Sequence, residues 1–431
     1  MRVAIAFEYP TVNGGENSMF AAIEWLLADP GSNDLELVAM CPRGGAVWDR
    51  LSALKIETVA FDRHVPAEGT QGRQRVVGAE RGEPPAGVGR KQGARCTRPQ
   101  PPRQSHATDQ EERSPQPSRE LQIESLITAV EAARPDVLHA NSLAMGRLHG
   151  AAASQLPCPT TAHLRDILKM SKAAVRDLNQ NSQLVAVSEA TREFHIAQGL
   201  TAERSCIIHN GIAPPIDSVA RTEARQRVRA ELGIPIDAHV LLTVGQIGLR
   251  KGLDTLARTA QLIAANSRTL HWLIVGERFS QKQESVDFEQ HVFATFQQAV
   301  PAVTTHRLGY RHDVADLMLA SDLLVHGARQ EPLGRVLLEA ASLQLPIVAT
   351  GVGGTREILD DGVSGLLVPA DDPPATASAI ERLLDHSDLR QRLAGEAALR
   401  VKQDFSIERS AQQLAAVWRS VCKEKKSRPE A

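Results

Sequence analysis

The sequence has few of the features that mark secreted, membrane-spanning or metal-binding proteins. Its five cysteines lie far apart, with no C-x-x-C pair and no spacing typical of a metal site. No apolar run approaches the ~18 residues that a transmembrane helix needs, and the apolar stretch at residues 3–7 is too short for a signal peptide. We therefore expect a cytoplasmic protein whose cysteines are reduced thiols.

Net charge and aromatic content are also low. The formal net charge is -2, and aromatic residues make up 3% of the chain. A nearly neutral chain has no global field that would attract nucleic acid or an anionic membrane. The basic tail at residues 423–428 permits at most a peripheral contact with lipid headgroups, and a solvated terminus is the simpler interpretation.

One segment, residues 67–118, lacks large apolar side chains. It contains no Leu, Ile, Phe, Met, Trp or Tyr, so it cannot bury enough apolar surface to offset the entropy of ordering it. Its Arg-, Pro-, Gly- and Gln-rich composition is that of a GC-rich coding sequence translated in a shifted frame. We expect either a compensated frameshift or a disordered insertion. Basic residues here are mixed with acids, without aromatic residues for base stacking, so nucleic acid is not an expected partner.

The rest of the chain alternates short β-rich runs with helical patterns. This alternation predicts parallel sheets built from βαβ units, and a length of 431 residues predicts more than one domain. The polar segment 213–233 separates two halves and is expected to hold the interdomain linker. The predicted strands are 3–7, 35–39, 58–61, 137–139, 160–163, 184–187 and 205–208 in the first half, and 240–244, 271–275, 304–308, 323–325, 347–349 and 365–368 in the second.

The most informative motif is the run EPLGRVLLE, from Glu331 to Glu339. A predicted strand ends just before it, and a helix with apolar periodicity begins within it. The loop and first helical turn therefore lie at the carboxyl end of a strand, where open α/β sheets bind ligands and free backbone N–H groups attract phosphate. Glu331 is expected in the loop, and Glu339 about two turns further on along the same helix face. Two carboxylates beside such a backbone suit a nucleotide-sugar, which has hydroxyls at both ends and charge in the middle.

Two other loops also follow predicted strands. Gly14 and Gly15 precede a helix predicted at residues 18–27, and paired glycines let the backbone approach a ligand closely, although most mark ordinary turns. Lys251 lies with Gly245 and Arg250 in a strand-to-helix loop, where its ammonium group could reach a phosphate as a compact charge.

Two histidines lie at the ends of predicted strands. His163 belongs to the run TAHLRD, and His139 belongs to the run LHANS. A histidine in such a place often only caps the strand, so the sequence by itself assigns a role to neither.

The run from Glu331 to Ala340, followed by PIVAT at 346–350 and GGTRE at 353–357, resembles the donor-site signature of family 4 retaining glycosyltransferases. The resemblance implies the GT-B fold, an α/β architecture of two Rossmann-like domains that face each other across a cleft, with a C-terminal helix that crosses back. On this pattern residues 1–212 form the N-terminal acceptor domain, interrupted by 67–118 and completed by 406–431. Residues 213–405 form the C-terminal donor domain.

The resemblance also implies roles for individual residues. Glu331 would accept hydrogen bonds from hydroxyls of the donor sugar, Lys251 would bind the diphosphate, and His163 would face the sugar from the other domain. The other donor-binding positions are expected to be Gly14, Gly15, Gly245, Arg250, Gly334, Arg335, Val336 and Glu339, the last of them at the ribose hydroxyls.

The expected reaction is transfer of a hexose, with retention, from a nucleotide diphosphate sugar to an unknown acceptor, which is a glycan, a lipid or a small molecule. No Asp-x-Asp pair occurs, so we expect catalysis without a metal ion and without a cofactor. Lys251 and the backbone N–H groups of residues 334–336 would stabilise the leaving group.

Two alternatives remain open. One is a nucleotide-sugar epimerase or phosphorylase on the same fold. The other is a catalytically impaired protein that binds sugar nucleotides, which is favoured by Gln246 and by His326-Gly327, where the family usually has Arg and Pro-Ser. Arg250 either replaces the missing cation or is merely solvated.

Overall fold

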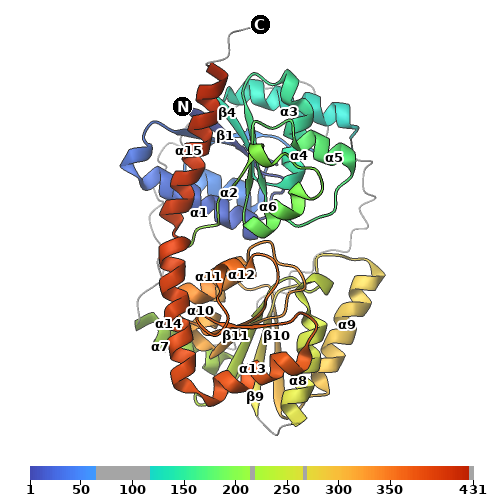
Figure 1. Ribbon diagram of the computed structural model, residues 1–431, viewed down its shortest axis with the longest axis vertical. Coiled ribbons are helices and arrows are strands. Elements are labelled where there is room, and N and C mark those ends of the chain that lie inside the picture. Colours follow the sequence, from blue (N-terminus) through green and yellow to red (C-terminus); the bar gives the residue numbers. More distant parts are fainter. Residues whose placement is uncertain (65–116, 214–218, 266–268, 427–431) are drawn as a thin grey trace, which may run out of the picture.

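The computed structural model describes residues 1–64, 117–213, 219–265 and 269–426 (Figure 1). The expectation for residues 67–118 therefore falls almost entirely outside the described residues. The strands of the first half are β1 (Arg2–Ala6), β2 (Glu36–Cys41), β3 (Glu57–Ala60), β4 (Val137–Ala140), β5 (Thr160–Leu164), β6 (Gln183–Ala186) and β7 (Ser205–Ile207). Those of the second half are β8 (His239–Val244), β9 (Leu270–Val275), β10 (Val303–Gly309), β11 (Leu323–His326), β12 (Ile347–Thr350) and β13 (Leu366–Val368).

These strands form two parallel sheets, one in each domain. The first sheet has seven strands in the order β3-β2-β1-β4-β5-β6-β7, and the second has six in the order β10-β9-β8-β11-β12-β13. Neighbours in both sheets run parallel. The predicted α/β class with two Rossmann-like domains is confirmed, and the predicted strands agree with the observed ones to within two residues at either end.

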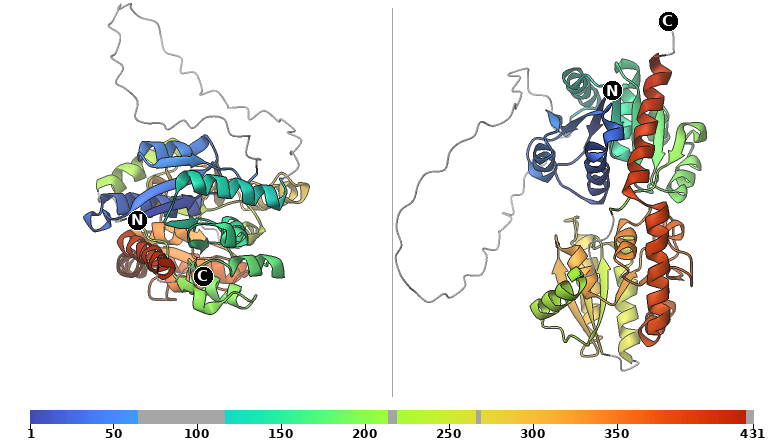
Figure 2. Two further views of the ribbon diagram at one scale, coloured as in Figure 1. Left: turned by 90° about the horizontal axis from the view of Figure 1, so that it is seen from above. Right: turned by 90° about the vertical axis from the view of Figure 1, so that its left-hand side faces the viewer.

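Helices connect the strands and cover both faces of each sheet (Figures 1 and 2). In the first domain they are α1 (Gly14–Ala28), α2 (Gly45–Ala53), α3 (Arg119–Ala133), α4 (Leu143–Ala152), α5 (Lys172–Leu178) and α6 (Glu189–Ile196). The remaining helices are α7 (Val219–Leu232), α8 (Leu253–Ala265), α9 (Gln283–Gln297), α10 (Val314–Ala320), α11 (Arg335–Ser342), α12 (Thr355–Ile358), α13 (Pro373–Asp385), α14 (Ser387–Asp404) and α15 (Ile407–Lys426). A single 3-10 turn, η4 (Leu249–Lys251), lies between β8 and α8.

The strands are largely apolar because both faces of each parallel sheet are buried. On one face of the first sheet, Phe20 and Trp418 belong to a single hydrophobic cluster, and Leu126 belongs to the cluster on the other face. The second sheet is enclosed in the same way, with Trp272 on one face and Leu337 on the other. Each domain therefore has its own core.

The carboxyl ends of the two sheets face each other. Ser188 lies two residues after the end of β6, and its hydroxyl donates to the carbonyl oxygen of Pro332 in the loop after β11. Arg335, at the start of α11, donates from Nη1 to Oγ of Ser18 in α1 at 3.1 Å. Loops that follow strands in one domain thus contact their counterparts in the other, and ligands bind at such ends of open α/β sheets.

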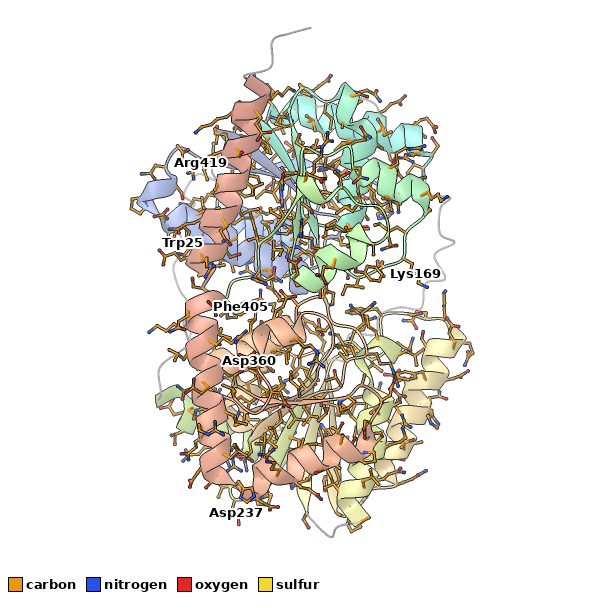
Figure 3. The ribbon with its side chains drawn as sticks, in the orientation of Figure 1. Trp25, Lys169, Asp237, Asp360, Phe405 and Arg419 are labelled. Carbon is orange, nitrogen blue, oxygen red and sulfur yellow. The ribbon has the colours of Figure 1, made fainter. Side chains whose placement is uncertain are left out.

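The last helix, α15, returns to the first domain. Phe405, labelled in Figure 3, lies where α14 ends and α15 begins, and its carbonyl oxygen accepts a hydrogen bond of 2.8 Å from the backbone of Ile212. Beyond this point α15 packs along α1, and its Trp418 is fully buried. No helix in the described ranges is long and apolar enough to cross a membrane.

The structure corrects one helix start and adds a helix to the segment between the two halves. The helix predicted at residues 18–27 begins at Gly14, because Asn13 caps it and the Glu16 carboxylate accepts a hydrogen bond of 3.1 Å from the Asn13 backbone N–H. Within the segment 213–233, which is expected to hold the linker, residues 219–232 form helix α7, and residues 214–218 lie outside the described residues. Ala224 and Val228 on this helix are buried in the core of the second domain, and polarity alone did not reveal that apolar stripe.

Candidate active site

The loop after β11 places Glu331 against the GGTRE run. Gly354 donates its backbone N–H to the carbonyl oxygen of Glu331 at 2.9 Å. A Cβ on Gly353, which has a φ of +49°, would lie only 2.2 Å from that same oxygen. The two motifs recognised in the sequence are therefore one packed unit, and the glycines are needed because backbone lies on backbone.

Glu331 is buried and holds two partners through one oxygen. Its Oε2 atom accepts from Nζ of Lys251 at 2.6 Å and lies 2.8 Å from Nε2 of His326. Burial raises the pKa of Glu331, but the His326 hydrogen bond and the Lys251 charge outweigh burial and lower the pKa to about 2. The carboxylate is ionised, and no hydrogen bond to its Oε1 atom occurs in the described part of the chain.

Lys251 reaches Glu331 from the loop after β8. The η4 turn ends at Lys251, and Gly252, with a φ of +63°, turns the chain into α8. Gly245 and Gln246 line a cavity of about 10 Å³ with Lys251 and His326, a volume that admits about one water molecule. The space beneath this loop is therefore too small for a ligand larger than water.

Arg250, which precedes Lys251, is partly exposed. Within the residues described, its guanidinium makes no hydrogen bond or ion pair, whereas its carbonyl oxygen accepts from the backbone of Arg329 at 2.8 Å. Gln246 is exposed beside it. The loop therefore offers one paired cation and one unpaired cation.

Helix α11 begins beside Glu331. Gly334 caps it with a φ of +105°, and the backbone N–H groups of Arg335 and Val336 make no hydrogen bond within the described ranges, as is usual for a first helical turn. Glu339 lies one turn into this helix and pairs with Nε of Arg335 at 2.7 Å. Glu331 lies in the loop before α11, as expected, and the helix itself begins at Arg335.

The first domain contributes Gly14 and Gly15 in the first turn of α1. A Cβ on Gly15 would lie 3.0 Å from Cδ of Arg165, so this glycine lets the arginine pass beneath the helix. Arg165 donates from Nη1 to Oδ1 of Asn210 at 2.8 Å and from Nη2 to Oδ1 of Asn141 at 2.9 Å. Burial lowers the pKa of Arg165 to about 10. The sequence did not single out this cation.

His163 lies in β5 and is buried. Its Nδ1 atom is 2.8 Å from Nε2 of His139 in β4. Burial, together with the charge of Arg165, lowers the pKa of both histidines well below the usual range, so both rings are neutral. The structure joins the two histidines that the sequence treated separately.

A further interdomain contact was missed. Glu357, the last residue of the GGTRE run, accepts hydrogen bonds of 3.0 Å from the backbone N–H groups of Glu189 and Ala190 at the start of α6. Its carboxylate also lies 2.8 Å from Nε2 of His209. These contacts tie the loop that contains Glu357 to the first domain. A carboxylate stabilises a helix N-terminus, but sequence spacing does not reveal which distant carboxylate takes that position.

The structure thus brings Glu331 and Lys251 together, and it places Glu339 with Arg335 beside α1. No hydrogen bond or ion pair in the described part of the chain links His163 to the second domain. No group of three or more His, Cys, Asp or Glu side chains that could hold a metal ion occurs among the described residues.

Comparison with known proteins identifies the class of this architecture. The family model "Glycosyl transferases group 1" matches residues 238–386, and "Glycosyltransferase Family 4" matches residues 82–214. The structure of Anabaena HepE in complex with UDP-glucose superposes with a TM-score of 0.73 at 19% identity, covering 97% of this chain and all of that one. Sucrose-phosphate synthase from Thermosynechococcus elongatus superposes with a TM-score of 0.69 at 16% identity, covering 98% of this chain and 99% of that one. The fold is therefore GT-B, as the resemblance implied.

Sequence relatives agree with this class. Alpha-D-kanosaminyltransferase from Streptomyces kanamyceticus is 31% identical over 205 residues, which are 47% of this chain and 51% of that protein. A D-inositol 3-phosphate glycosyltransferase from Xylanimonas cellulosilytica is 28% identical over 317 residues, or 68% of this chain and 74% of that one. The first alignment spans about half of the relative's length. The chain belongs to the family 4 type of GT-B glycosyltransferases, and its predicted class, a transferase, is confirmed.

Proposed function

We propose that the protein transfers a hexose from a nucleotide diphosphate sugar to an acceptor hydroxyl with retention of the anomeric configuration and without a metal ion. The observation that supports this proposal best is the unit formed by Glu331 and Lys251 at the start of α11. Among the described residues, it combines a carboxylate oxygen without a hydrogen bond, an ammonium group and unpaired backbone N–H groups at the edge that faces the other domain. The UDP-glucose bound by HepE makes UDP-sugars the first donors to test.

Each group of this unit matches one part of such a donor. Oε1 of Glu331 accepts from a sugar hydroxyl, while Oε2 stays bonded to Lys251 and His326. The ammonium of Lys251 uses one N–H on Glu331 and offers the others to the diphosphate. The first turn of α11 adds backbone N–H groups and the positive end of its dipole. The charge that develops on the leaving diphosphate is thereby stabilised.

The remaining predicted residues complete the donor site. Glu339 has one carboxylate oxygen on Arg335, and its other oxygen is available to the ribose hydroxyls. Gly14 and Gly15 bring the backbone of α1 close to the diphosphate, and Gly245 does so from the loop after β8. Arg250 supplies the cation that Gln246 lacks.

The proposed transfer needs no nucleophile from the enzyme. The acceptor oxygen attacks the anomeric carbon on the face from which the nucleotide departs, and the bond between that carbon and the phosphate oxygen breaks. The proton of the acceptor hydroxyl passes to the departing diphosphate oxygen. His163 contacts the sugar from the first domain during this step.

A donor panel tests this function. The protein is incubated with UDP-, GDP- and ADP-sugars, and free nucleotide and changed sugar are measured separately. Release of free nucleotide from one base is expected. A sugar that is epimerised but still attached to the nucleotide would identify an epimerase, whereas binding without release would identify a non-catalytic binding protein.

Stereochemistry and metal dependence provide a second test. With an α-linked donor, NMR of the product is expected to show an α linkage, and EDTA is expected to leave the rate unchanged. A β-linked product, or activity that only Mn²⁺ restores, would contradict the proposed mechanism.

A further inference from the structure

Strand register places three polar side chains on one face of the first sheet. His139 in β4 is the register partner of Thr161 in β5. His163 lies two residues beyond Thr161, and side chains two apart on a strand point to the same face. Tertiary structure therefore lines up a hydroxyl and two imidazoles where the sequence shows only two separate strand ends.

These three side chains form an unbroken hydrogen-bonded chain. Oγ1 of Thr161 lies 2.8 Å from Nδ1 of His139, and Nε2 of His139 lies 2.8 Å from Nδ1 of His163. Thr161 and His139 are fully buried, and His163 is 3% exposed. The indole of Trp418, on α15, packs edge-on against the His139 ring, with 5.4 Å between the ring centroids. The C-terminal helix therefore covers these hydrogen-bonded side chains.

The hydrogen-bond partners available to each side chain determine which atom donates and which accepts. Within the described residues, Nδ1 of His139 is the only hydrogen-bond partner of the Thr161 hydroxyl. If that nitrogen carried the proton, the hydroxyl proton would be buried without an acceptor, which is costly. Thr161 therefore donates to Nδ1 of His139. A neutral His139 then carries its proton on Nε2 and donates it to Nδ1 of His163.

The same argument determines the far end of the chain. Since Nδ1 of His163 accepts, the proton of its neutral ring resides on Nε2. No hydrogen bond to this Nε2 atom occurs in the part of the chain that the structure describes. The atom is also not one of the fully buried side-chain nitrogen and oxygen atoms that lack a partner. Burial keeps the pKa of both histidines well below the usual range, which is consistent with one proton shared along the N–H···N bond.

We propose that Thr161 and His139 are positioning residues that hold His163 as its Nε2–H tautomer, so that His163 acts as a hydrogen-bond donor to an oxygen of the bound sugar. This inference rests on the proposed function only for the identity of that oxygen. The tautomer itself is a property of the free protein.

Nitrogen NMR tests the tautomer without any donor. Long-range ¹H–¹⁵N spectra of the full chain labelled at its histidines distinguish the Nε2–H ring from the Nδ1–H ring, and the His163→Asn variant assigns the signal. At pH 7 we expect a neutral Nε2–H ring for His163. A neutral Nδ1–H ring or a charged ring would overturn the proposal.

Isosteric variants test the positioning residues. Thr161→Val removes the hydroxyl and retains the shape, so the His163 signal should shift toward a mixture of tautomers. Thr160→Val is the matched control, because the neighbouring Thr160 hydroxyl is buried and has no partner in the described ranges, and it should leave the signal unchanged. Equal spectra for Thr161→Val and the wild type would exclude the role of Thr161.

A pair of substitutions at the middle position separates hydrogen bonding from packing. In His139→Gln the introduced amide can accept from Thr161 and donate to His163, so the Nε2–H tautomer should persist, whereas His139→Leu should lose it. If His139→Leu does not fold, the threonine pair still decides the question. The same tautomer mixture in both position-139 variants would argue for packing alone.

Kinetics supply the last readout. Loss of one hydrogen bond of this kind should lower kcat of Thr161→Val by about three- to tenfold, with a smaller change in KM and with His139→Gln close to the wild type. If the wild type shows the Nε2–H tautomer but releases no nucleotide from any donor, the proposed function fails and the positioning chain stands. Normal turnover with the other tautomer would instead refute the positioning chain and leave the proposed function standing.

Discussion

The ion pair between Glu331 and Lys251 allows a double-mutant cycle on stability. Its atoms are 2.6 Å apart, with 7% of the Glu331 side chain and 20% of the Lys251 side chain exposed. Glu331→Gln changes one atom and removes the negative charge, and Lys251→Met keeps the apolar stem and removes the positive one. Either single change leaves the other charge partly buried without its counter-ion.

The expected energies lie between those of buried and surface pairs. Breaking a fully buried pair costs about 3–5 kcal/mol, and an exposed pair contributes about 0.2–1 kcal/mol. Because Lys251 retains some contact with water, we expect each single variant to lose about 2 kcal/mol of unfolding free energy. The double variant should also lose about 2–3 kcal/mol, which gives a coupling energy of about 1–2 kcal/mol.

Urea unfolding followed by tryptophan fluorescence measures the four proteins of the cycle. The pair Asp404 and Arg409 provides the control, because its atoms are 3.8 Å apart and more than half of each side chain is exposed. The effects of its two single substitutions on unfolding free energy should add to the effect of the double substitution within about 0.5 kcal/mol. If the effects at Glu331 and Lys251 are also additive within about 0.5 kcal/mol, the pair is not coupled as the structure indicates.

The pH dependence of unfolding free energy gives a second test of the same ion pair. The pKa of Glu331 is about 2 in the folded protein and 4.5 ordinarily. A carboxyl group with a depressed pKa contributes stability that is fully present above its ordinary pKa and is lost as the pH falls through the folded value. The stability difference between wild type and Glu331→Gln should therefore be constant above about pH 5 and shrink toward pH 2.

Two further predictions concern a core histidine and the cations of the donor loop. Both ring nitrogens of His149 lack a partner in the described part of the chain, and burial lowers its pKa from 6.5 to about 3, so the unfolded chain binds one proton more between these values. The stability advantage of His149→Leu over the wild type should then grow by about 1.4 kcal/mol per pH unit below pH 6.5, and equal advantages in urea unfolding at pH 7 and pH 5.5 would contradict this expectation. Arg250→Ala should raise the KM for the donor about fivefold and Gln246→Arg should lower it, each by about 1 kcal/mol of binding. Unchanged KM values in both variants, with exposed Lys282→Ala as control, would exclude Arg250 as a donor contact.

Local sequence predicted the architecture well because the determinants of the strands are local. Leu323 to Val325 is an uninterrupted apolar run and Val240 to Val244 is apolar apart from Thr243, a composition that is typical of a strand buried on both faces. The start of α1 was predicted four residues too late, although Asn13 and Glu16 have the spacing of a capping box. The glycines at 14 and 15 were taken for a loop because glycine usually disfavours a helix interior.

Contacts between residues far apart in the sequence were harder to predict. The sequence predicts Lys251 at the diphosphate and Glu331 at the donor sugar, but their direct pairing spans 80 residues and depends on how β8 and β11 lie side by side. The bond between His139 and His163 depends on the β4–β5 register in the same way. Sequence spacing within one element cannot specify such pairs. The roles of these residues in catalysis stay predictions.

The most direct test of the central claim is the rate of nucleotide release from the donor that the panel identifies. Wild type is compared with Lys251→Ala and Glu331→Gln, and exposed Lys282→Ala and Glu284→Gln serve as matched controls. We expect each site variant to lose about 10²- to 10³-fold in kcat, with both controls unchanged. Rates within threefold of wild type for both site variants would contradict the assignment of this loop as the donor site.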